Sequence, residues 1–254
     1  MFFDTHAHLD DERFDSDRQA LIEGLPERGI SYVVNVGADM DSSRRSVELA
    51  EQYPFIYAAV GVHPHTAEEI EDSDLDVLLE MAQHPKVVAI GEIGLDYYYD
   101  NSPRDIQRKR FIDQLELSIK AALPVVIHSR DAYKDTMDIL TEYKSRLKGC
   151  VLHCYSGSWE MAETYLKMGF FISLGGPVTF KNAARPVQVA QNIDLSRLLL
   201  ETDCPYLAPH PFRGQRNDPG LISLTAEKIA RLRGMETEKL AEITLKNACK
   251  FFKV

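Results

Sequence analysis

The sequence is poor in cysteine and has no long apolar run. Its four cysteines are Cys150, Cys154, Cys204 and Cys249. They form no CxxC pair and no disulfide framework, so we expect reduced thiols in a reducing compartment. No apolar stretch approaches the roughly 20 residues that span a bilayer, and no basic and apolar signal segment precedes Asp4. We therefore expect a cytoplasmic protein that does not contact membranes.

The sequence also has fewer positively charged than negatively charged residues. The 254 residues carry 29 Lys and Arg against 39 Asp and Glu, which gives a formal net charge of −10. This balance argues against broad electrostatic attraction to nucleic acid or to anionic lipid. A polyanionic substrate would have to be held by a few local arginines or by metal ions. The sequence indicates no obligate protein partner.

Short apolar, β-branched runs alternate along the chain with amphipathic stretches of helical character. The predicted strands are Phe2–His8, Ser31–Gly37, Phe55–Val62, Val87–Ile93, Pro124–His128, Cys150–Tyr155, Phe170–Leu174 and Leu198–Asp203. They read as continuous apolar runs, as parallel strands buried on both faces do. Eight such strand–helix repeats in about 250 residues predict an α/β fold of the (β/α)8 TIM-barrel class.

No linker, internal repeat or low-complexity tract divides the chain, so we expect one domain over residues 1–254. A doubly wound open sheet is the alternative architecture. It is the weaker interpretation because no glycine-rich phosphate-binding turn follows the first predicted strand.

The N-terminal stretch MFFDTHAHLD contains the first chemical signal. His6 and His8 are two residues apart, and in a strand such residues point to the same face. Asp4 lies on that face as well and is expected to steady an imidazole. An HxH pair alone is weak support for a metal site, because histidines also occur on exposed strand edges.

Further polar residues follow the ends of other predicted strands. They are His63, His65, Glu92, His128, His153 and Asp203. In a (β/α)8 barrel these ends lie at one mouth, where active sites are found. Imidazole and carboxylate together suit transition metals, and a carboxylate such as Glu92 can bridge two ions. We expect two divalent ions at this mouth, with zinc, manganese, magnesium, cobalt and nickel all open.

Several of these residues stand within longer motifs. The motifs are DTHAHLD, VGVHPH, GEIGLDYYYD, PVVIHSRDA, LHCYSGS, ISLGG, LLLETDCPYLAP and RGQRNDP. In this order, and over nearly the whole chain, they resemble the TatD family of metal-dependent deoxyribonucleases in the amidohydrolase superfamily. One departure falls in RGQRNDP, where Gln215 and Asp218 replace the Lys and Glu common in the family, so the resemblance is weaker in this loop.

The resemblance implies which residues would bind each of the two metal ions. His6 and His8 would hold one ion with Asp203. Glu92 would bridge to a second ion, which His128 and His153 would complete.

The resemblance also implies catalytic roles for Asp203 and His63, and the residue types suggest substrate contacts. Asp203 would take a proton from the attacking water, and His63 would donate a proton to the leaving oxygen or bind phosphate. Arg130 and Arg213 are candidates for phosphate recognition, because a guanidinium matches phosphate oxygens in a bidentate way. We place His65 and Glu201 with these substrate-side residues, and Glu201 shares a strand face with Asp203.

Three functions remain open at this point. The leading one is hydrolysis of DNA phosphodiester bonds by a metal-activated hydroxide, acting as an exonuclease on strand ends or single-stranded tails. The second is hydrolysis of a small amide, lactone or phosphotriester, since one fold supports many reactions. The third is a metal-loaded protein that binds nucleic acid or a partner without turnover.

Overall fold

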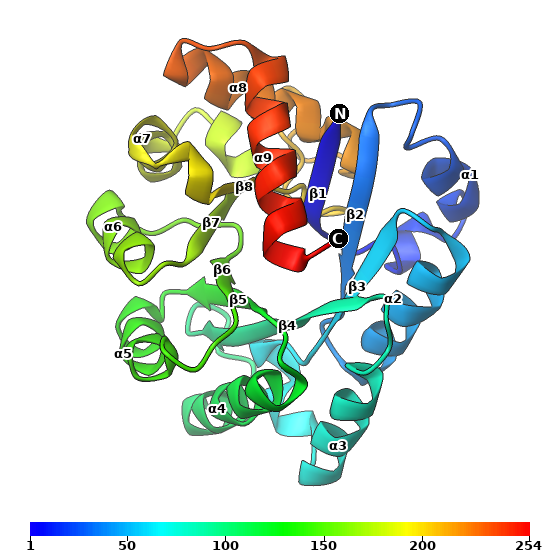
Figure 1. The fold of residues 1–254 in the computed structure, drawn as a ribbon, viewed down its shortest axis with the longest axis vertical. Helices are drawn as coiled ribbons and strands as arrows, with labels where there is room; N and C mark the ends of the chain where they lie inside the picture. The colour runs from blue at the N-terminus through cyan, green and yellow to red at the C-terminus, as the bar shows by residue number, and fades with distance from the viewer. The chain divides into compact units, whose positions relative to one another are not determined.

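The computed structural model describes all residues from 1 to 254. Its strands are β1 (Phe2–Ala7), β2 (Ile30–Val36), β3 (Ile56–Val60), β4 (Val87–Asp96), β5 (Val125–Arg130), β6 (Cys150–Leu152), β7 (Phe171–Leu174) and β8 (Leu198–Leu200). Its α-helices are α1 (Arg18–Glu23), α2 (Met40–Gln52), α3 (Asp72–Met81), α4 (Arg104–Ala121), α5 (Tyr133–Tyr143), α6 (Trp159–Lys167), α7 (Ala184–Asn192), α8 (Ile222–Arg233) and α9 (Thr237–Phe252). Figure 1 follows these elements in chain order by colour.

The eight strands belong to one sheet in the order β1 to β8. Consecutive order, with a helix after every strand, is the topology of a (β/α)8 barrel, so the predicted fold class is confirmed. The doubly wound alternative is wrong, because that architecture reverses its strand order at a switch point. Each of the eight predicted strands is present, with ends that differ by a few residues.

The chain divides into two compact units. Unit 1 comprises Met1–Asn35, His153–Lys167 and Phe171–Val254, and unit 2 comprises Val36–Leu152 and Met168–Phe170. Unit 1 therefore contains β7, β8, β1 and nearly all of β2, whereas unit 2 contains β3 to β6. The expectation of a single domain over residues 1–254 stays a prediction.

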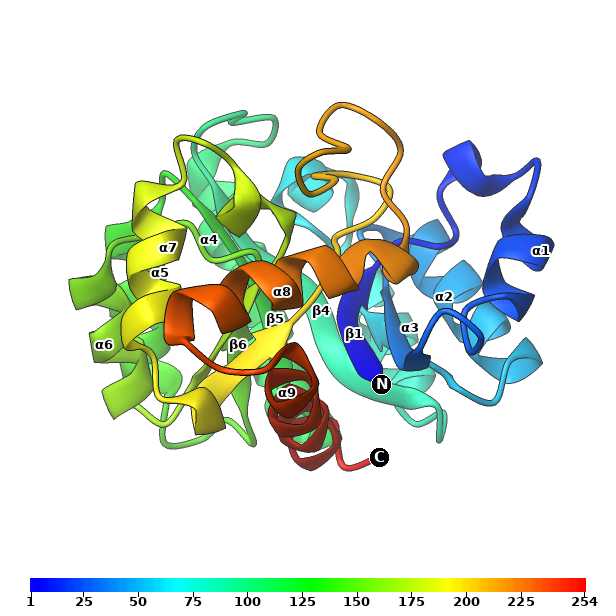
Figure 2. The same ribbon diagram turned by 90° about the horizontal axis from the view of Figure 1, so that it is seen from above.

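In unit 1, the end of the chain packs on its beginning. The strand β1 pairs in parallel with β2, and Ala7 forms a parallel bridge with Cys204, which follows β8. Helices α8 and α9 lie against β1 in Figures 1 and 2. The buried rings of Phe3 on β1 and Phe252 on α9 are 5.8 Å apart. This apolar contact fixes β1, the strand that carries the first two histidines.

In unit 2, the strand β4 is buried along its whole length. It pairs in parallel with β3 and β5, and β5 pairs with β6. Two buried amides of α4 hold the strand ends. Gln114 accepts from the amide of Val62 and donates to its carbonyl, and Gln107 accepts from the amide of Asp96. The ends of β3 and β4 are therefore tied to one helix.

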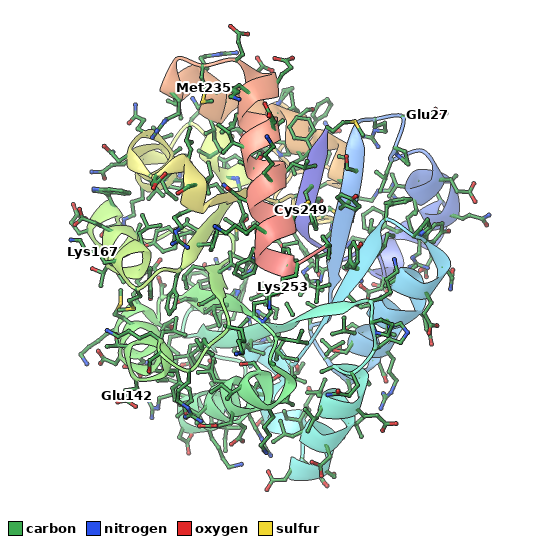
Figure 3. The ribbon with its side chains drawn as sticks, in the orientation of Figure 1. Glu27, Glu142, Lys167, Met235, Cys249 and Lys253 are labelled. Atoms are coloured by element: carbon green, nitrogen blue, oxygen red, sulfur yellow. The ribbon has the colours of Figure 1, made fainter.

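Charged side chains lie on the outer surfaces of the helices. In unit 1, Lys167 at the end of α6 is exposed and pairs with Glu163, and in unit 2 Glu142 on α5 is exposed (Figure 3). No helix combines the length and the apolar character that a membrane span requires.

Two strand ends, those of β6 and β8, differ from the prediction for an identifiable reason. The strands β6 and β8 stop at Leu152 and Leu200, before the predicted ends. Cys154 and Asp203 adopt positive φ angles of 41° and 58°, which an extended strand cannot continue through. Strand β4, by contrast, runs three residues beyond its predicted end, to Asp96.

Gly94 is required where β4 passes β5. It has a φ of 144°, and a Cβ at this position would lie 2.0 Å from the carbonyl oxygen of His128. We expect Gly94→Ala to lower the free energy of unfolding by about 2–4 kcal/mol, because the added carbon overpacks the site and strains the backbone. Urea unfolding monitored by circular dichroism measures this loss.

Gly234→Ala is the matched control for that substitution. Gly234 also has a positive φ, of 60°, but no atom lies within 4 Å of the position that a Cβ would take there. The substitution should cost only about 1 kcal/mol. Equal losses for the two variants would show that close approach to His128 does not matter.

Candidate metal sites

Unit 1 gathers two histidines and an acid at the ends of β1 and β8. The Nε2 atoms of His6 and His8 are 3.1 Å apart, and they lie 3.7 and 3.4 Å from Oδ1 of Asp203. One candidate ligand atom from each of these three residues lies within 4.8 Å of those of the other two. The prediction that His6 and His8 point the same way is confirmed. Three such donors match the partial shell of a divalent metal.

A second group in unit 1 shares His6. The rings of His6 and His153 are stacked, with centroids 4.0 Å apart, and Nδ1 of His153 lies 3.6 Å from Oε1 of Glu201. That oxygen accepts from the amide of Cys154, whereas the buried Oε2 has no hydrogen-bond partner. A buried carboxylate oxygen without a donor is costly. A cation would satisfy it, so these residues fit a metal site.

The charge state of Asp203 also suits a ligand. Desolvation acts to raise the pKa of this carboxyl, but the hydrogen bond from His8 and the nearby imidazoles of His6 and His153 hold the pKa below its usual value. Asp203 is therefore a carboxylate at neutral pH, as metal binding requires.

Backbone contacts place Asp203 beside the histidines. Its amide donates to the carbonyl of His6, and the amide of His8 donates to the carbonyl of Cys204. The preceding Thr202 donates both its amide and its hydroxyl to Asp4. The positive φ of Asp203, which short polar residues tolerate, then turns its side chain out of the strand direction.

The expected role of Asp4 is corrected here. Its carboxyl accepts from Thr202 and from the backbone amide of His6, and it contacts no imidazole. Burial raises the pKa of Asp4 to about 8 in spite of these hydrogen bonds. Asp4 therefore fixes the backbone that carries the ligands.

Unit 2 holds another group, with Glu92 on β4, His128 on β5 and His63 shortly after β3. Nδ1 of His128 is 2.8 Å from Oε1 of Glu92, and Nε2 of His63 is 3.6 Å from the same oxygen. The candidate ligand atoms of these three residues fall within 4.8 Å of one another. His63 thus lies beside two predicted metal ligands, and its role as a proton donor or phosphate ligand stays a prediction.

Asp96 is a site residue that the sequence analysis missed. Its Oδ2 lies 2.9 Å from Nε2 of His65 and 3.1 Å from Nε2 of His128. Burial opposes ionisation of Asp96, but these hydrogen bonds, with those from backbone amides, hold its pKa well below the usual range. His128 therefore uses both ring nitrogens on carboxylates, and a cation bound by His128 would replace one of these contacts. The spacing from Glu92 was an available signal, since residues i and i+4 of a strand share a face.

The two predicted phosphate-binding arginines stack on aromatic rings. In unit 2, Arg130 lies 4.0 Å from the ring centroid of Tyr98, and in unit 1 Arg213 lies 4.4 Å from that of Phe180. Neither guanidinium forms a hydrogen bond or an ion pair. Arg216, in the same late loop as Arg213, is instead paired with both carboxylate oxygens of Asp17.

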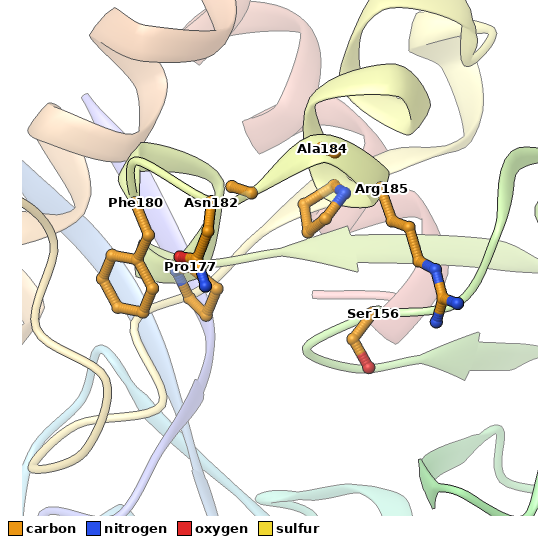
Figure 4. Close-up of a pocket in the computed structure, with 8 residues that line it drawn as sticks. Ser156, Pro177, Phe180, Asn182, Ala184 and Arg185 are labelled. Carbon is orange, nitrogen blue, oxygen red and sulfur yellow. The ribbon is translucent and has the colours of Figure 1, made fainter.

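A pocket of about 390 Å³ lies in unit 1, lined by Ser156 and by residues of the segment that follows β7. Figure 4 shows Ser156 and Arg185 on one side of it and Phe180 and Asn182 on the other. Its volume is near the lower end of the range for small-molecule sites. Because Arg213 stacks on Phe180, this pocket has a candidate phosphate-binding group at its border.

Comparisons with known proteins find relatives over the whole chain. Residues 3–253 match the family model described as TatD related DNase. The chain is 47% identical to the uncharacterized metal-dependent hydrolase YabD of Bacillus subtilis, with all of both chains covered. It is 34% identical to the 3′-5′ ssDNA/RNA exonuclease TatD of Erwinia tasmaniensis, over 98% of this chain and 99% of that one. The crystal structure of YJJV, a TatD homologue from Escherichia coli, superposes with a TM-score of 0.94 at 32% identity, covering 100% and 98% of the two chains.

Metal binding should be visible as a gain in stability. We expect Zn²⁺ or Mn²⁺ to raise the melting temperature of metal-free protein, because a ligand specific for the folded state stabilises it by about 2.7 kcal/mol at 100 times its Kd. The double variant His6→Asn, His8→Asn should lose part of this rise, since it removes two of the three donors of one group. Scanning calorimetry across a metal titration measures both effects.

The control for this experiment is His84→Asn. His84 pairs with Glu51 and belongs to none of the three groups of candidate ligands. Its variant should show the full rise. If the double variant at residues 6 and 8 also keeps the full rise, the metal site in unit 1 is refuted.

Proposed function

The chain belongs to the TatD-related DNase family of metal-dependent hydrolases, and from that premise we propose that it hydrolyses phosphodiester bonds at the ends of single-stranded DNA. The name of the Erwinia tasmaniensis relative, an exonuclease acting on single-stranded DNA and RNA, supports this direction. The proposed substrate is thus a polyanion, although the chain itself is acidic.

The observation that carries the proposal is the unused hydrogen-bonding capacity of Arg130 and Arg213. In an acidic chain most arginines find carboxylates, as Arg110 does with Asp72 and Arg146 with Glu116. Arg130 and Arg213 do not, and stacking on a ring leaves their N–H edges available. Such an edge matches two phosphate oxygens.

The strand register sharpens this point for Arg130. Its partner on the neighbouring strand is Asp96. That carboxylate hydrogen-bonds to His65 and His128 instead of pairing with the arginine. An arginine whose neighbouring acid is already occupied is free to receive an anion from outside.

We further propose the residues that hold divalent ions. His6, His8 and Asp203 would bind one ion, and Glu92 and His128 would bind a second. The predicted bridge by Glu92 and the ligation by His153 stay predictions. When bound, such ions supply Lewis acidity at a phosphoryl oxygen and lower the pKa of a coordinated water.

The protein's own side chains would then move the protons. Asp203, a carboxylate at neutral pH, accepts a proton from the attacking water. His63 is buried beside Glu92 and donates a proton to the leaving oxygen. His65 is held by its hydrogen bond to Asp96, and Glu201 lies beside His153. The substrate-side roles of His65 and Glu201 stay predictions.

A metal-dependent exonuclease assay tests the proposed reaction. End-labelled single- and double-stranded DNA should be shortened in the presence of Mg²⁺, Mn²⁺ or Zn²⁺, with single strands preferred and with no activity after chelation. His128→Ala should reduce kcat by at least about 100-fold, because even the partners of metal ligands are commonly worth 10- to 100-fold. His84→Asn should behave as the parent protein.

Two results would contradict the proposed function and favour one of the alternatives. Hydrolysis of a neutral ester or lactone, with no DNA cleaved in any metal, would favour the small-molecule alternative. Binding of DNA without turnover in any metal, unaffected by Glu92→Ala, would favour a non-catalytic binding protein.

The arginines give a separate prediction. Arg130→Gln and Arg213→Gln should each raise KM for single-stranded DNA by about tenfold or more, since a charged hydrogen bond contributes roughly 1.5–3 kcal/mol. Each should also flatten the dependence of log KM on log salt by about 0.7, the slope per phosphate contact on single strands. Steady-state kinetics at several salt concentrations measures both.

Arg146→Gln is the matched control for these variants. Arg146 also stacks on a tyrosine, Tyr143, but is paired with Glu116. It should leave KM and the salt slope unchanged. If all three variants behave alike, the free guanidiniums do not contact phosphate.

A further inference from the structure

Tyr98 and Tyr99 form an exposed aromatic surface immediately after β4, which we call the tyrosine platform. Their side chains are 58% and 55% exposed, among the most exposed large apolar side chains of the protein. The two rings are 5.0 Å apart and nearly perpendicular. Contiguous exposed apolar groups, unlike singly scattered ones, are a feature of interaction sites.

The platform is held in place in spite of its exposure. The backbone amides of both tyrosines donate to Oδ1 of Asp96, each at 2.9 Å. The guanidinium of Arg130 lies 4.0 Å from the Tyr98 ring centroid and 4.7 Å from that of Tyr99. The edge of the Tyr99 ring also meets His65, with centroids 5.2 Å apart. Ordered rings lose little entropy when they bind a partner.

One carboxylate joins the platform to the candidate site of unit 2. While Oδ1 of Asp96 fixes the two tyrosine amides, its Oδ2 hydrogen-bonds to His65 and His128. A shift of the Asp96 side chain would move the two tyrosines and the two imidazoles together. A single buried group therefore contacts both the platform and the imidazoles.

We propose that the tyrosine platform stacks a base of the single-stranded substrate while Arg130 contacts a phosphate of the same strand. The inference rests on the proposed function and adds to it a subsite that selects strands with unpaired bases. Every nucleobase presents a π-face, so aromatic stacking binds single strands without regard to sequence. A base in a duplex is stacked on its neighbours and does not offer that face.

A scan of abasic positions tests the proposal. Pentathymidylates carrying one abasic residue at each position in turn are compared with the intact strand, for the parent protein and for Tyr98→Ala and Tyr99→Ala. In the parent protein, removal of one particular base should raise KM about tenfold, the effect of one base–aromatic stack. In the alanine variants KM for the intact strand should rise by a similar factor, and removal of that base should add little.

This loss of additivity is the diagnostic result, because only a base and a ring that touch show coupling in such a cycle. Tyr98→Phe and Tyr99→Phe keep the rings and should preserve the coupling. Tyr143→Ala removes a tyrosine from another arginine–tyrosine pair of unit 2 and should leave the whole scan as in the parent protein. Circular dichroism melts of each variant separate loss of stacking from loss of fold.

If the effects of base removal and of the tyrosine substitutions are fully additive at every position, the proposal that the platform stacks a base is refuted, even if the protein is an efficient nuclease. If the parent protein cleaves no oligonucleotide in any metal, the proposed function fails, and the same scan is read by fluorescence anisotropy of labelled strands. Coupling in the binding data would then support the platform independently of catalysis, and its absence would refute it.

Discussion

Buried acids on the strands are the groups on which the rest of the site depends. An acid withdrawn from water needs several hydrogen-bond partners. Asp96, the last residue of β4, is a carboxylate that accepts from two imidazoles and two backbone amides. Asp4, within β1, has its pKa raised to about 8 by burial and is bound by Thr202 and the amide of His6. In satisfying these acids, the fold fixes both the histidines and the loops that follow the strands.

The same constraint explains how an acidic protein keeps arginines available for an anion. Because the carboxylate of Asp96 is committed to imidazoles, the neighbouring Arg130 is left to stack on tyrosine. Arginines elsewhere in the chain, such as Arg110 and Arg146, meet acids that have no imidazole partner. At Arg130, positive charge is therefore available because the neighbouring buried acid is already occupied, and a low overall positive charge is compatible with local recognition of phosphate.

The sequence predicted the strands well because parallel strands buried on both faces are continuous apolar runs. It also placed His6, His8 and His128 at strand ends, where the structure has them. It missed Asp96 because the predicted fourth strand stopped at Ile93, which put Asp96 in a loop and hid its alternation with Glu92. The turns at Cys154 and Asp203 could not be predicted, since a positive φ in such residues depends on contacts with other strands.

The late loop shows why a motif does not by itself separate structural from substrate residues. Within RGQRNDP, Asn217 is buried and donates to the carbonyls of Thr202 and Tyr206. Asp218 accepts from the amide of Gly220 and pairs with Arg28, while Arg216 pairs with Asp17. The shorter acid at position 218 therefore still caps the helical turn that follows it. Most residues of this motif therefore hold the loop in place within unit 1. Arg213 is the arginine of the motif whose guanidinium has no acidic partner, so it is available to a substrate.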